Sequence, residues 1–337
     1  MKLYTDEGWL NIPEIIKIGT PFIFIVGARG IGKTYGAIDY VLEEDIRFMF
    51  TRRTQKQADL ISIPEMSPLK SPCMDRGINY TVKKIAKDCS GIFTDEEEPH
   101  ILGYTTALST ISGLRGFDAS DVKIWIFDEF IPERHERAIK CEGEAFLNAY
   151  ETINRNRELK GEPPLLCLCL SNANDVGNPI FTGLGLSDVA MKMQRKHQGV
   201  YINKERGITI ILPQNSPISE QKKQTALYRA TTGNSKFTDM AVNNAFEQEM
   251  CVGNRNIRDY KPIVRCGIMN FYQHKSSPEI YCSYHKSGSC ETYDSDMTSV
   301  LQFKANNKWL LLSLVKNEIV FESIELKREF ERIFVHY

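Results

Sequence analysis

A glycine-rich segment directly after an apolar run restricts the fold of this chain more than any other feature. Residues 27–34 read GARGIGKT and satisfy the pattern G-x-x-x-x-G-K-[ST] at every position. The apolar run Phe22–Val26 before them predicts a buried strand, and residues 34–42 after them predict a helix. In this strand–loop–helix context the pattern forms a phosphate-binding loop. We therefore expect the chain to bind a nucleoside triphosphate.

Each residue of the loop has a chemical reason to be there. Lys33 supplies positive charge near the β- and γ-phosphates, and Thr34 offers its hydroxyl to Mg²⁺. The helix that begins near Lys33 adds the positive end of its dipole. The predicted phosphate-binding residues are Gly27, Ala28, Arg29, Gly30, Ile31, Gly32, Lys33 and Thr34.

A second apolar run, residues 123–127, ends in the acidic pair Asp128 and Glu129. A carboxylate at the end of such a strand reaches the sheet edge where the loop holds Mg²⁺, so Asp128 is the predicted metal ligand. Glu129 is the predicted base that polarises the attacking water. Residues 203–206 read NKER, with arginine where the guanine-reading motif N-K-x-D needs aspartate, so a guanine switch is disfavoured. No single residue identifies adenine.

In P-loop NTPases an arginine, often from a neighbouring subunit, stabilises the negative charge of the transition state. Several arginines of this chain are candidates for that role. Arg155 and Arg157 follow a predicted helix, and either can be that arginine or a solvated helix-end charge. Arg115 lies in a glycine-containing loop, from which it can reach a neighbour's nucleotide or DNA phosphate. Arg52 and Arg53 leave the strand predicted over 47–51, where they can contact nucleotide or an adjacent subunit.

Four apolar strands separated by helical stretches predict a parallel sheet covered on both faces. The fourth strand, residues 165–170, is followed by Ser171 and Asn172. A polar residue there can hydrogen-bond the γ-phosphate or the attacking water, although a plain turn cap is an equally good reading. Segments 78–82 and 91–93 predict a small antiparallel insertion.

The chain is predicted to have three parts: an α/β domain over residues 1–215, a helical linker over 216–256 and a small α+β domain over 257–337. Two polar segments, 220–229 and 238–250, are the predicted linker helices. In the last part we expect strands over 263–272, 279–284, 309–314 and 319–321 and an amphipathic helix over 324–335.

Composition excludes other classes of protein. With 42 Lys and Arg against 43 Asp and Glu the chain is not a uniformly basic nucleic-acid coat, although a local basic surface remains possible. No apolar run is long enough to cross a bilayer, and no signal peptide is read at the N-terminus. We expect a protein made and kept in the cytoplasm of its host.

Four segments in this order resemble one family: residues 26–33, 127–131, 155–158 and 169–173. The chain is similar to the genome-packaging ATPases of small tailed phages with protein-primed double-stranded DNA, which are relatives of the large-terminase motors. The resemblance implies a P-loop ATPase of the additional-strand, catalytic-glutamate type. It also implies a homomeric ring, typically a pentamer, on the portal of an empty bacterial-virus prohead, where ATP drives double-stranded DNA inward.

The resemblance also implies roles for individual residues. Glu129 becomes the catalytic base, Arg155 the arginine that acts on a neighbour, and Ser171 with Asn172 a coupling motif. Arg115 matches a basic loop residue of the family. The last domain is expected to be a vestigial, non-cutting RNase H-like domain, because its strand over 263–272 contains no acid. The family often docks on a packaging RNA, which nothing in this sequence indicates or excludes.

Two other functions are compatible with the motifs. One is a different ring-forming DNA translocase or helicase. The other is a nucleotide-gated adaptor that binds ATP without hydrolysing it, against which the adjacent Asp128 and Glu129 argue.

Overall fold

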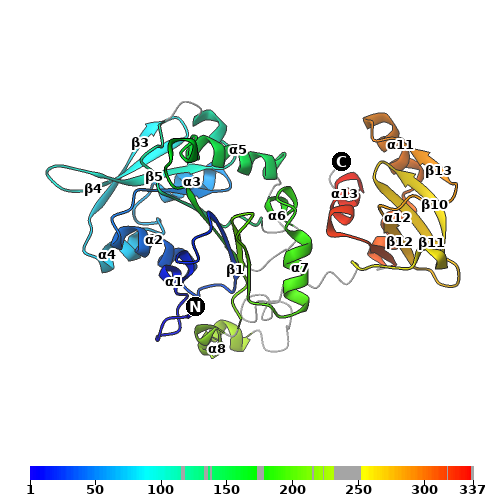
Figure 1. The fold of residues 1–337 in the computed structure, drawn as a ribbon, viewed down its shortest axis with the longest axis horizontal. Coiled ribbons are helices and arrows are strands. Elements are labelled where there is room, and N and C mark those ends of the chain that lie inside the picture. The colour runs from blue at the N-terminus through cyan, green and yellow to red at the C-terminus, as the bar shows by residue number, and fades with distance from the viewer. Residues whose placement is uncertain are drawn as a thin grey trace. The chain divides into compact units, whose positions relative to one another are not determined.

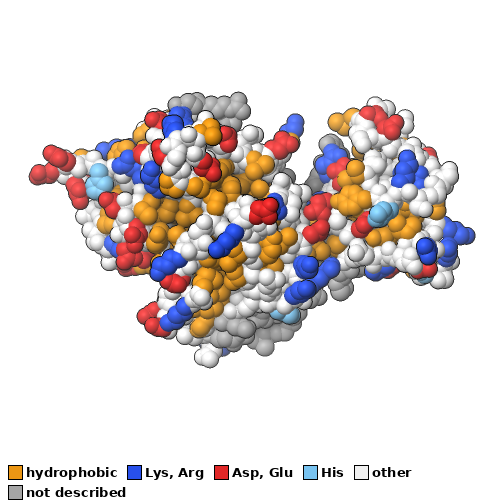
Figure 2. Space-filling model, in the orientation of Figure 1, with side chains coloured by type: hydrophobic (Ala, Val, Ile, Leu, Met, Phe, Trp, Pro, Cys, Tyr) orange, Lys and Arg blue, Asp and Glu red, His pale blue; other side chains and the backbone are white. Residues whose placement is uncertain are grey.

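The computed structural model describes two compact units, residues 1–247 and 248–337, each with its own sheet (Figure 1). Within the described residues, every helix is too short or too polar to form a membrane span. Figure 2 shows acidic and basic side chains interspersed on the face in view, in keeping with the near-balanced charge of the sequence. The structure describes all residues except 115–117, 133–135, 137–138, 173–177, 215, 223, 231–251, 317 and 335–337.

Among its described residues, the first unit forms a nine-stranded sheet in the order β3-β4-β5-β2-β6-β7-β1-β9-β8. The six strands from β5 to β9 in this order are parallel, so the prediction of a mainly parallel sheet is confirmed. The strands are β1 (Phe22–Gly27), β2 (Phe48–Arg52), β3 (Tyr80–Ala86), β4 (Cys89–Thr94), β5 (Ile101–Ala107), β6 (Ile124–Asp128), β7 (Leu166–Asn172), β8 (Val200–Asn203) and β9 (Ile208–Ile211).

Strand β7 lies between β1, which leads into the glycine-rich loop, and β6, which ends in Asp128. Its register pairs Asn172 with Gly27 on one side, and Leu170 with Asp128 on the other. The loop strand and the acid strand are thus separated by one inserted strand, as the additional-strand arrangement requires. Parallel pairing brings the carboxyl ends of all three strands to one edge of the sheet.

Helices cover both faces of this sheet; in Figure 1, α1 and α2 lie on one side of β1, and α6 and α7 on the other. The first side has α1 (Ile12–Ile16), α2 (Lys33–Glu43), α3 (Gln55–Ile61) and α4 (Lys70–Asp75), whose apolar residues share one core with the strands. Further helices of this unit include α5 (Glu142–Asn154), α6 (Pro179–Gly183) and α7 (Ser187–Arg195), with short 3-10 turns at Ile111–Leu114 and Glu158–Lys160.

Alternation along the strands divides the core into two chemically different layers. In β1, Ile23 and Ile25 join a mainly aliphatic cluster beneath α2, whereas Phe24 faces an aromatic layer. There the ring of Phe146 from α5 stacks on Trp125 at 5.2 Å between centroids and on Phe127 at 6.0 Å. Burial by both layers explains why these strands are continuously apolar in sequence.

The predicted antiparallel insertion is confirmed and is part of the main sheet. Strands β3 and β4 form a hairpin, and β4 pairs antiparallel with β5, which is itself parallel to β2. The hairpin therefore extends the sheet at the edge far from β1, the strand that leads into the phosphate loop.

The region predicted as a helical linker begins with two short helices, α8 (Pro217–Lys222) and α9 (Ala226–Ala230). Ser216, Ile218 and Ser219 are buried, so α8 packs on the first unit. The second predicted linker helix, over residues 238–250, lies outside the described residues.

The second unit has a five-stranded sheet in the order β13-β10-β11-β12-β14 in the residues described. Strands β10, β11 and β12 form an antiparallel meander, and β13 and β14 pair in parallel at its edges. The elements are a 3-10 turn at Ile257–Asp259, β10 (Tyr260–Cys266), β11 (Met269–His274), β12 (Ile280–Ser283), β13 (Glu291–Tyr293), α11 (Met297–Asn306), α12 (Trp309–Val315), β14 (Ile319–Phe321) and α13 (Ile324–Phe334).

Two predictions for this unit were wrong. The single strand predicted over 263–272 is a hairpin, because Gly267 adopts φ 54° in the turn between β10 and β11. The strand predicted over 309–314 is the helix α12. Its run of leucines fits the periodicity of a strand and that of a helix alike. Tertiary packing selects the helix, because it buries Leu310 and leaves Leu312 exposed.

The aromatic layer makes Phe146 a strong determinant of stability. We expect Phe146→Ala to lower the free energy of unfolding by about 3–5 kcal/mol, because it leaves a cavity among stacked rings. Chemical denaturation of the full chain measures this. Leu147→Ala, next to it on α5 but half-exposed, is the control and should change stability by less than about 0.5 kcal/mol. Equal effects of the two substitutions would contradict the assignment of this core.

Candidate active site

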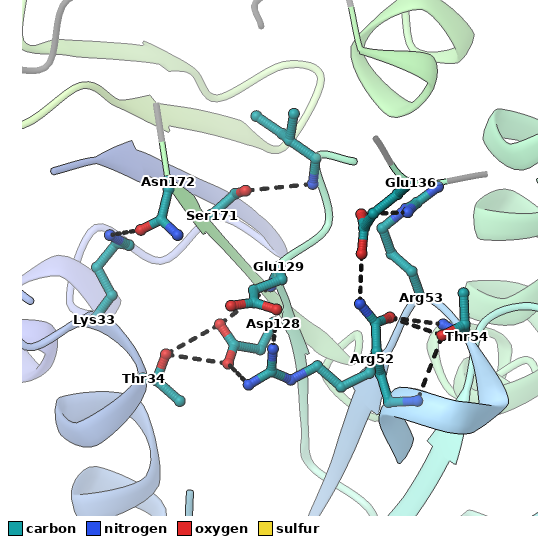
Figure 3. Close-up of polar contacts among 12 residues, drawn as sticks. Lys33, Thr34, Arg52, Arg53, Thr54, Asp128, Glu129, Glu136, Ser171 and Asn172 are labelled. Atoms are coloured by element: carbon teal, nitrogen blue, oxygen red, sulfur yellow. Dashed lines mark hydrogen bonds and ion pairs between the residues drawn. The ribbon is translucent and has the colours of Figure 1, made fainter. Parts of the chain in front are cut away.

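A cavity of about 200 Å³ opens at the edge of the first sheet where β1, β6 and β7 end. The strands deliver residues far apart in sequence, and the start of α2 closes the other side. The cavity is lined by Gly30, Gly32, Lys33, Thr34, Tyr35, Asp128, Glu129, Ser171 and Asn172. The structure thus brings the glycine-rich loop, the acidic pair and the end of β7 to one place (Figure 3).

The loop backbone depends on two glycines in the left-handed region, Gly30 with φ 66° and Gly32 with φ 91°. Side chains there would be strained, and Gly32 is also the residue from which α2 begins. Ile31 is buried, and its carbonyl accepts a hydrogen bond from the Leu10 N–H at 2.9 Å. Gly27 and Ala28 are buried where β1 enters the loop, whereas Arg29 is exposed. The loop is therefore anchored by its buried residues, and the Arg29 side chain lies on the outside.

Lys33 is almost completely buried at the centre of this loop. Its ammonium donates to the carbonyls of Gly27 at 2.9 Å and Ala28 at 2.7 Å, and to the amide oxygen of Asn172 at 3.2 Å. Burial lowers the pKa of Lys33 to about 8, a shift that the nearby Asp128 carboxylate partly opposes. Asn172 and Lys33, both predicted to contact phosphate, are therefore hydrogen-bonded to each other.

Asp128 is a buried carboxylate that accepts a hydrogen bond from the Glu129 N–H at 3.1 Å and has two side-chain partners. The Thr34 hydroxyl donates to its oxygens at 3.0 and 3.1 Å, and the Arg52 guanidinium forms an ion pair with it at 3.0 Å. Burial raises the pKa of the Asp128 carboxyl above its ordinary value, while Arg52 and the Thr34 hydrogen bond act in the opposite direction. The two predicted metal-binding residues, Thr34 and Asp128, are thus in direct contact.

Glu129 has a left-handed backbone, φ 55°, which is rare for a residue with a side chain. Strain of this kind is usually found at functional sites. The turn directs the Glu129 carboxylate back to the cavity, where it is half-exposed and forms an ion pair with Arg52. Arg52 therefore bridges the predicted metal ligand and the predicted base (Figure 3).

Arg53 points away from Arg52 (Figure 3) and is fully buried. Its guanidinium donates to both carboxylate oxygens of Glu142, at 2.6 and 2.9 Å, and to Glu136 at 2.8 Å. Glu142 is the first residue of α5. Arg53 thus joins the end of β2 to α5 and is buried within its own chain, whereas a contact with nucleotide or an adjacent subunit was predicted.

Arg155 and Arg157, which the sequence does not distinguish, have different environments. Arg157 is buried and donates to the backbone carbonyls of Ala119, Ser120 and Val122, which precede β6. Arg155 caps α5 with φ 47° and keeps about a third of its side chain exposed, 3.8 Å from Asp118. It lines a second cavity, of about 540 Å³. Arg115 lies outside the described residues.

Arg155 lies near the amino ends of the parallel strands, whereas the phosphate loop lies at their carboxyl ends. The residue before it, Asn154, accepts a hydrogen bond at 2.9 Å from Leu165, where β7 is about to begin, whereas the loop follows the end of β1. Five residues of β6 separate the edges by about 15 Å. Arg155 is therefore remote from the loop of its own chain.

Comparison with known proteins shows the family and the fold of this chain. The family model of the podovirus DNA encapsidation protein (Gp16) matches residues 9–256, which include both cavities. The chain belongs to this Gp16 family. The DNA packaging proteins of Bacillus phages PZA and phi29 are each 26% identical over 248 residues, 72% of this chain. That of Bacillus phage B103 is 27% identical over 228 residues, 66% of this chain.

The sequence match spans 65% of the length of the PZA and phi29 relatives, and the fold match is wider. A solved structure of the bacteriophage phi29 viral genome packaging motor assembly superposes with a TM-score of 0.67 at 18% identity, over 97% of this chain and 99% of that one. The phi28 gp11 DNA packaging motor gives 0.62 at 19% identity, over 99% of both chains. Both units of this Gp16-family chain therefore have the fold of those motor subunits.

Two features of this Gp16-family site have no signal in the sequence. The bridge from Arg52 to Asp128 and Glu129 depends on β2 and β6 being neighbours in the sheet. Lys222, at the end of α8, donates to the Arg29 carbonyl at 2.7 Å from a polar segment without a motif. Neither can be predicted without the tertiary structure.

Removing Arg52 leaves the Asp128 carboxylate buried without its cation. We expect Arg52→Ala to lower the free energy of unfolding by about 3 kcal/mol near neutral pH, as measured by urea denaturation. The folded-state pKa of Asp128, already raised by burial, rises further in this variant. Its folded form then binds a proton more readily than the unfolded chain, so the loss should shrink as the pH falls through that raised pKa.

Arg47→Ala is the matched control, because it removes a half-exposed pair between Arg47 and Asp121. Its cost should stay below about 1 kcal/mol at each pH. A penalty of Arg52→Ala that grew on acidification would contradict the assignment of Arg52 as the partner of a buried carboxylate.

Proposed function

We propose that this chain is the ATP-hydrolysing motor subunit that drives double-stranded DNA into a phage prohead through the portal. The observation that carries the proposal is the contact between Thr34 of the phosphate loop and Asp128 of the acidic pair. Membership of the Gp16 family and the fold shared with the phi29 packaging motor assembly supply the biological setting.

In this proposal Lys33 binds the β- and γ-phosphates of ATP. Its ammonium now donates to two backbone carbonyls and Asn172, and exchanging these partners for phosphate oxygens requires only a local movement. The N–H groups of the loop and of the first turn of α2 complete the phosphate site. Asn172, beside Lys33, is then near enough to respond to the γ-phosphate.

The residues present fit Mg²⁺, which binds oxygen ligands and is usually held by one or two carboxylates together with substrate phosphates. The Thr34 hydroxyl and the Asp128 carboxylate would hold it. Bound there, the ion neutralises charge on the phosphates. Among the described residues that line the cavity, Asp128 and Glu129 are the carboxylates, as expected if phosphate oxygens provide the other ligands.

Glu129 is the proposed general base. Its carboxylate must accept a proton from water, and the ion pair with Arg52 lowers its availability for this role. Hydrolysis therefore requires Glu129 to leave Arg52, while Arg52 continues to neutralise Asp128. Ser171 accepts a hydrogen bond from the Ile131 N–H at 3.3 Å and so joins the end of β7 to the segment that follows Glu129.

Arg155 is the proposed arginine that stabilises the transition state in a neighbouring subunit. Its position at the opposite edge of the sheet supports action between subunits, and the polar cavity beside it gives a neighbour space to dock. Because Arg155 then needs a neighbouring subunit, the proposal includes a homomeric ring on the prohead, and we propose a pentamer. Packaging RNA is a further partner to test in that assembly.

We propose that the second unit does not cut DNA. Cleavage by two metals needs several convergent carboxylates. Glu279 is engaged by Arg255 and Tyr260, and Asp296 caps α11. No cluster of three or more metal-binding side chains occurs among the described residues, in support of a vestigial role.

The base assignment predicts that Glu129→Gln loses ATP hydrolysis and DNA packaging while keeping its fold. The expected fall in kcat is about 10²-fold or more, because glutamine cannot accept the proton. Phosphate release and DNA protection from nuclease, measured with proheads and DNA, test this. Glu205→Gln, an exposed acid in the β8–β9 turn, is the control and should package normally. Normal packaging by Glu129→Gln would refute the proposed mechanism.

Action between subunits predicts that Arg155→Ala binds ATP nearly normally but hydrolyses it about 10³-fold more slowly. Mixing it with Glu129→Gln should restore part of the activity, because some interfaces then pair an intact base with an intact arginine. Arg157→Ala should instead lower the unfolding free energy, since three backbone carbonyls lose their donor. Complete inactivity at every mixing ratio would count against action between subunits.

A further inference from the structure

Lys222, the last residue of α8, reaches the phosphate loop from a different part of the chain. Its ammonium donates to the Arg29 carbonyl at 2.7 Å. It also occupies the space next to Gly30 where a Cβ atom would otherwise lie. Because Gly30 lines the active-site cavity, the Lys222 ammonium lies beside the phosphate-binding backbone.

The N-terminal segment holds α8 in this position. Gly8, with φ 92°, packs against Pro217 and Ile218, and the Tyr4 hydroxyl donates to the Gln214 carbonyl at 2.8 Å. The same segment is attached to the phosphate loop through the hydrogen bond from Leu10 to Ile31. The position of Lys222 is therefore fixed from both sides.

The charge around Lys222 is unbalanced. In the part of the chain that the structure describes, no carboxylate forms an ion pair with it, and Asp128 and Glu129 are both engaged by Arg52. Partial burial lowers the pKa of Lys222, and its charge contributes to lowering the pKa of Lys33. Lys33 and Lys222 therefore lie close together at a glycine-rich loop, and the carboxylates of Asp128 and Glu129 are already paired with Arg52. Such an excess of positive charge favours the binding of an anion.

We propose that Lys222 is a second phosphate-binding lysine of this site, delivered by the helix that follows the ATPase sheet. The inference rests on the proposed function, because it takes the triphosphate of ATP as the ligand. The Lys222 ammonium has three N–H donors. It can therefore donate a hydrogen bond to a phosphate oxygen while it continues to donate to the Arg29 carbonyl. Gly30 is then needed for space as well as for backbone conformation.

This role links nucleotide occupancy to the chain beyond the sheet. Lys222 holds α8 on the loop more firmly when phosphate is present, because a charge-assisted hydrogen bond is added. The segment after α8 leads to the second unit, so loss of phosphate loosens the start of that connection. Arg155 acts from the opposite edge of the sheet and is not part of this link.

Lys222→Gln separates charge from hydrogen bonding, because glutamine can still donate to the Arg29 carbonyl. We expect the affinity of the full chain for ATP and for inorganic tripolyphosphate, measured by titration calorimetry, to fall about tenfold or more. Lys222→Arg should retain most of the affinity. Lys204→Gln is the control, with the same change of charge in the exposed turn between β8 and β9, and should bind within twofold of the unmodified chain.

Hydrogen exchange of residues 216–222 provides a second measurement. Tripolyphosphate should slow exchange there in the unmodified chain and not in Lys222→Gln. If Lys222→Gln binds both ligands within twofold while Lys33→Ala loses them, Lys222 is structural and the inference is wrong, although the proposed function stands. If the unmodified chain binds neither ligand, or Lys33→Ala binds them normally, the proposed function fails together with the inference.

Discussion

Asp128 ends a completely buried strand, at a depth where an unpaired charge would be costly. Two side chains offset part of this cost: Thr34 approaches from the phosphate loop and Arg52 from the neighbouring strand. Both approaches depend on the parallel register that brings β1, β7, β6 and β2 to one edge. Changing any of these pairings would remove Thr34 or Arg52 from Asp128.

Two adjacent arginines extend this arrangement through the molecule. Arg52 faces the carboxylates of Asp128 and Glu129, and Arg53 turns the other way into a buried pair with Glu142. Glu142 begins α5, and Arg155 caps its end at the far edge of the sheet. The end of β2 therefore contacts both the proposed hydrolytic site and the helix whose other end carries the proposed intersubunit arginine.

The local parts of this fold are readable from sequence because they depend on local chemistry. The phosphate loop needs glycines at left-handed positions such as Gly32, and strands buried on both faces need continuous apolar runs. The errors occurred where one pattern fits two structures. The apolar run of α12 satisfies the helix and strand periods alike, and the hairpin at Gly267 depends on one turn residue inside an apolar stretch.

By itself, the sequence determined the phosphate loop, the acidic pair and the mainly parallel sheet, since each follows from residue types at fixed spacing. Only the tertiary structure decided the environment of each arginine. Arg53 and Arg157 are buried with their partners, Arg52 pairs with the carboxylates of Asp128 and Glu129, and the Arg155 side chain is partly exposed. It also brought Lys222 to the loop. The reason is that a cation's role depends on which carboxylate, carbonyl or phosphate lies within a few ångströms, and chain folding sets that distance.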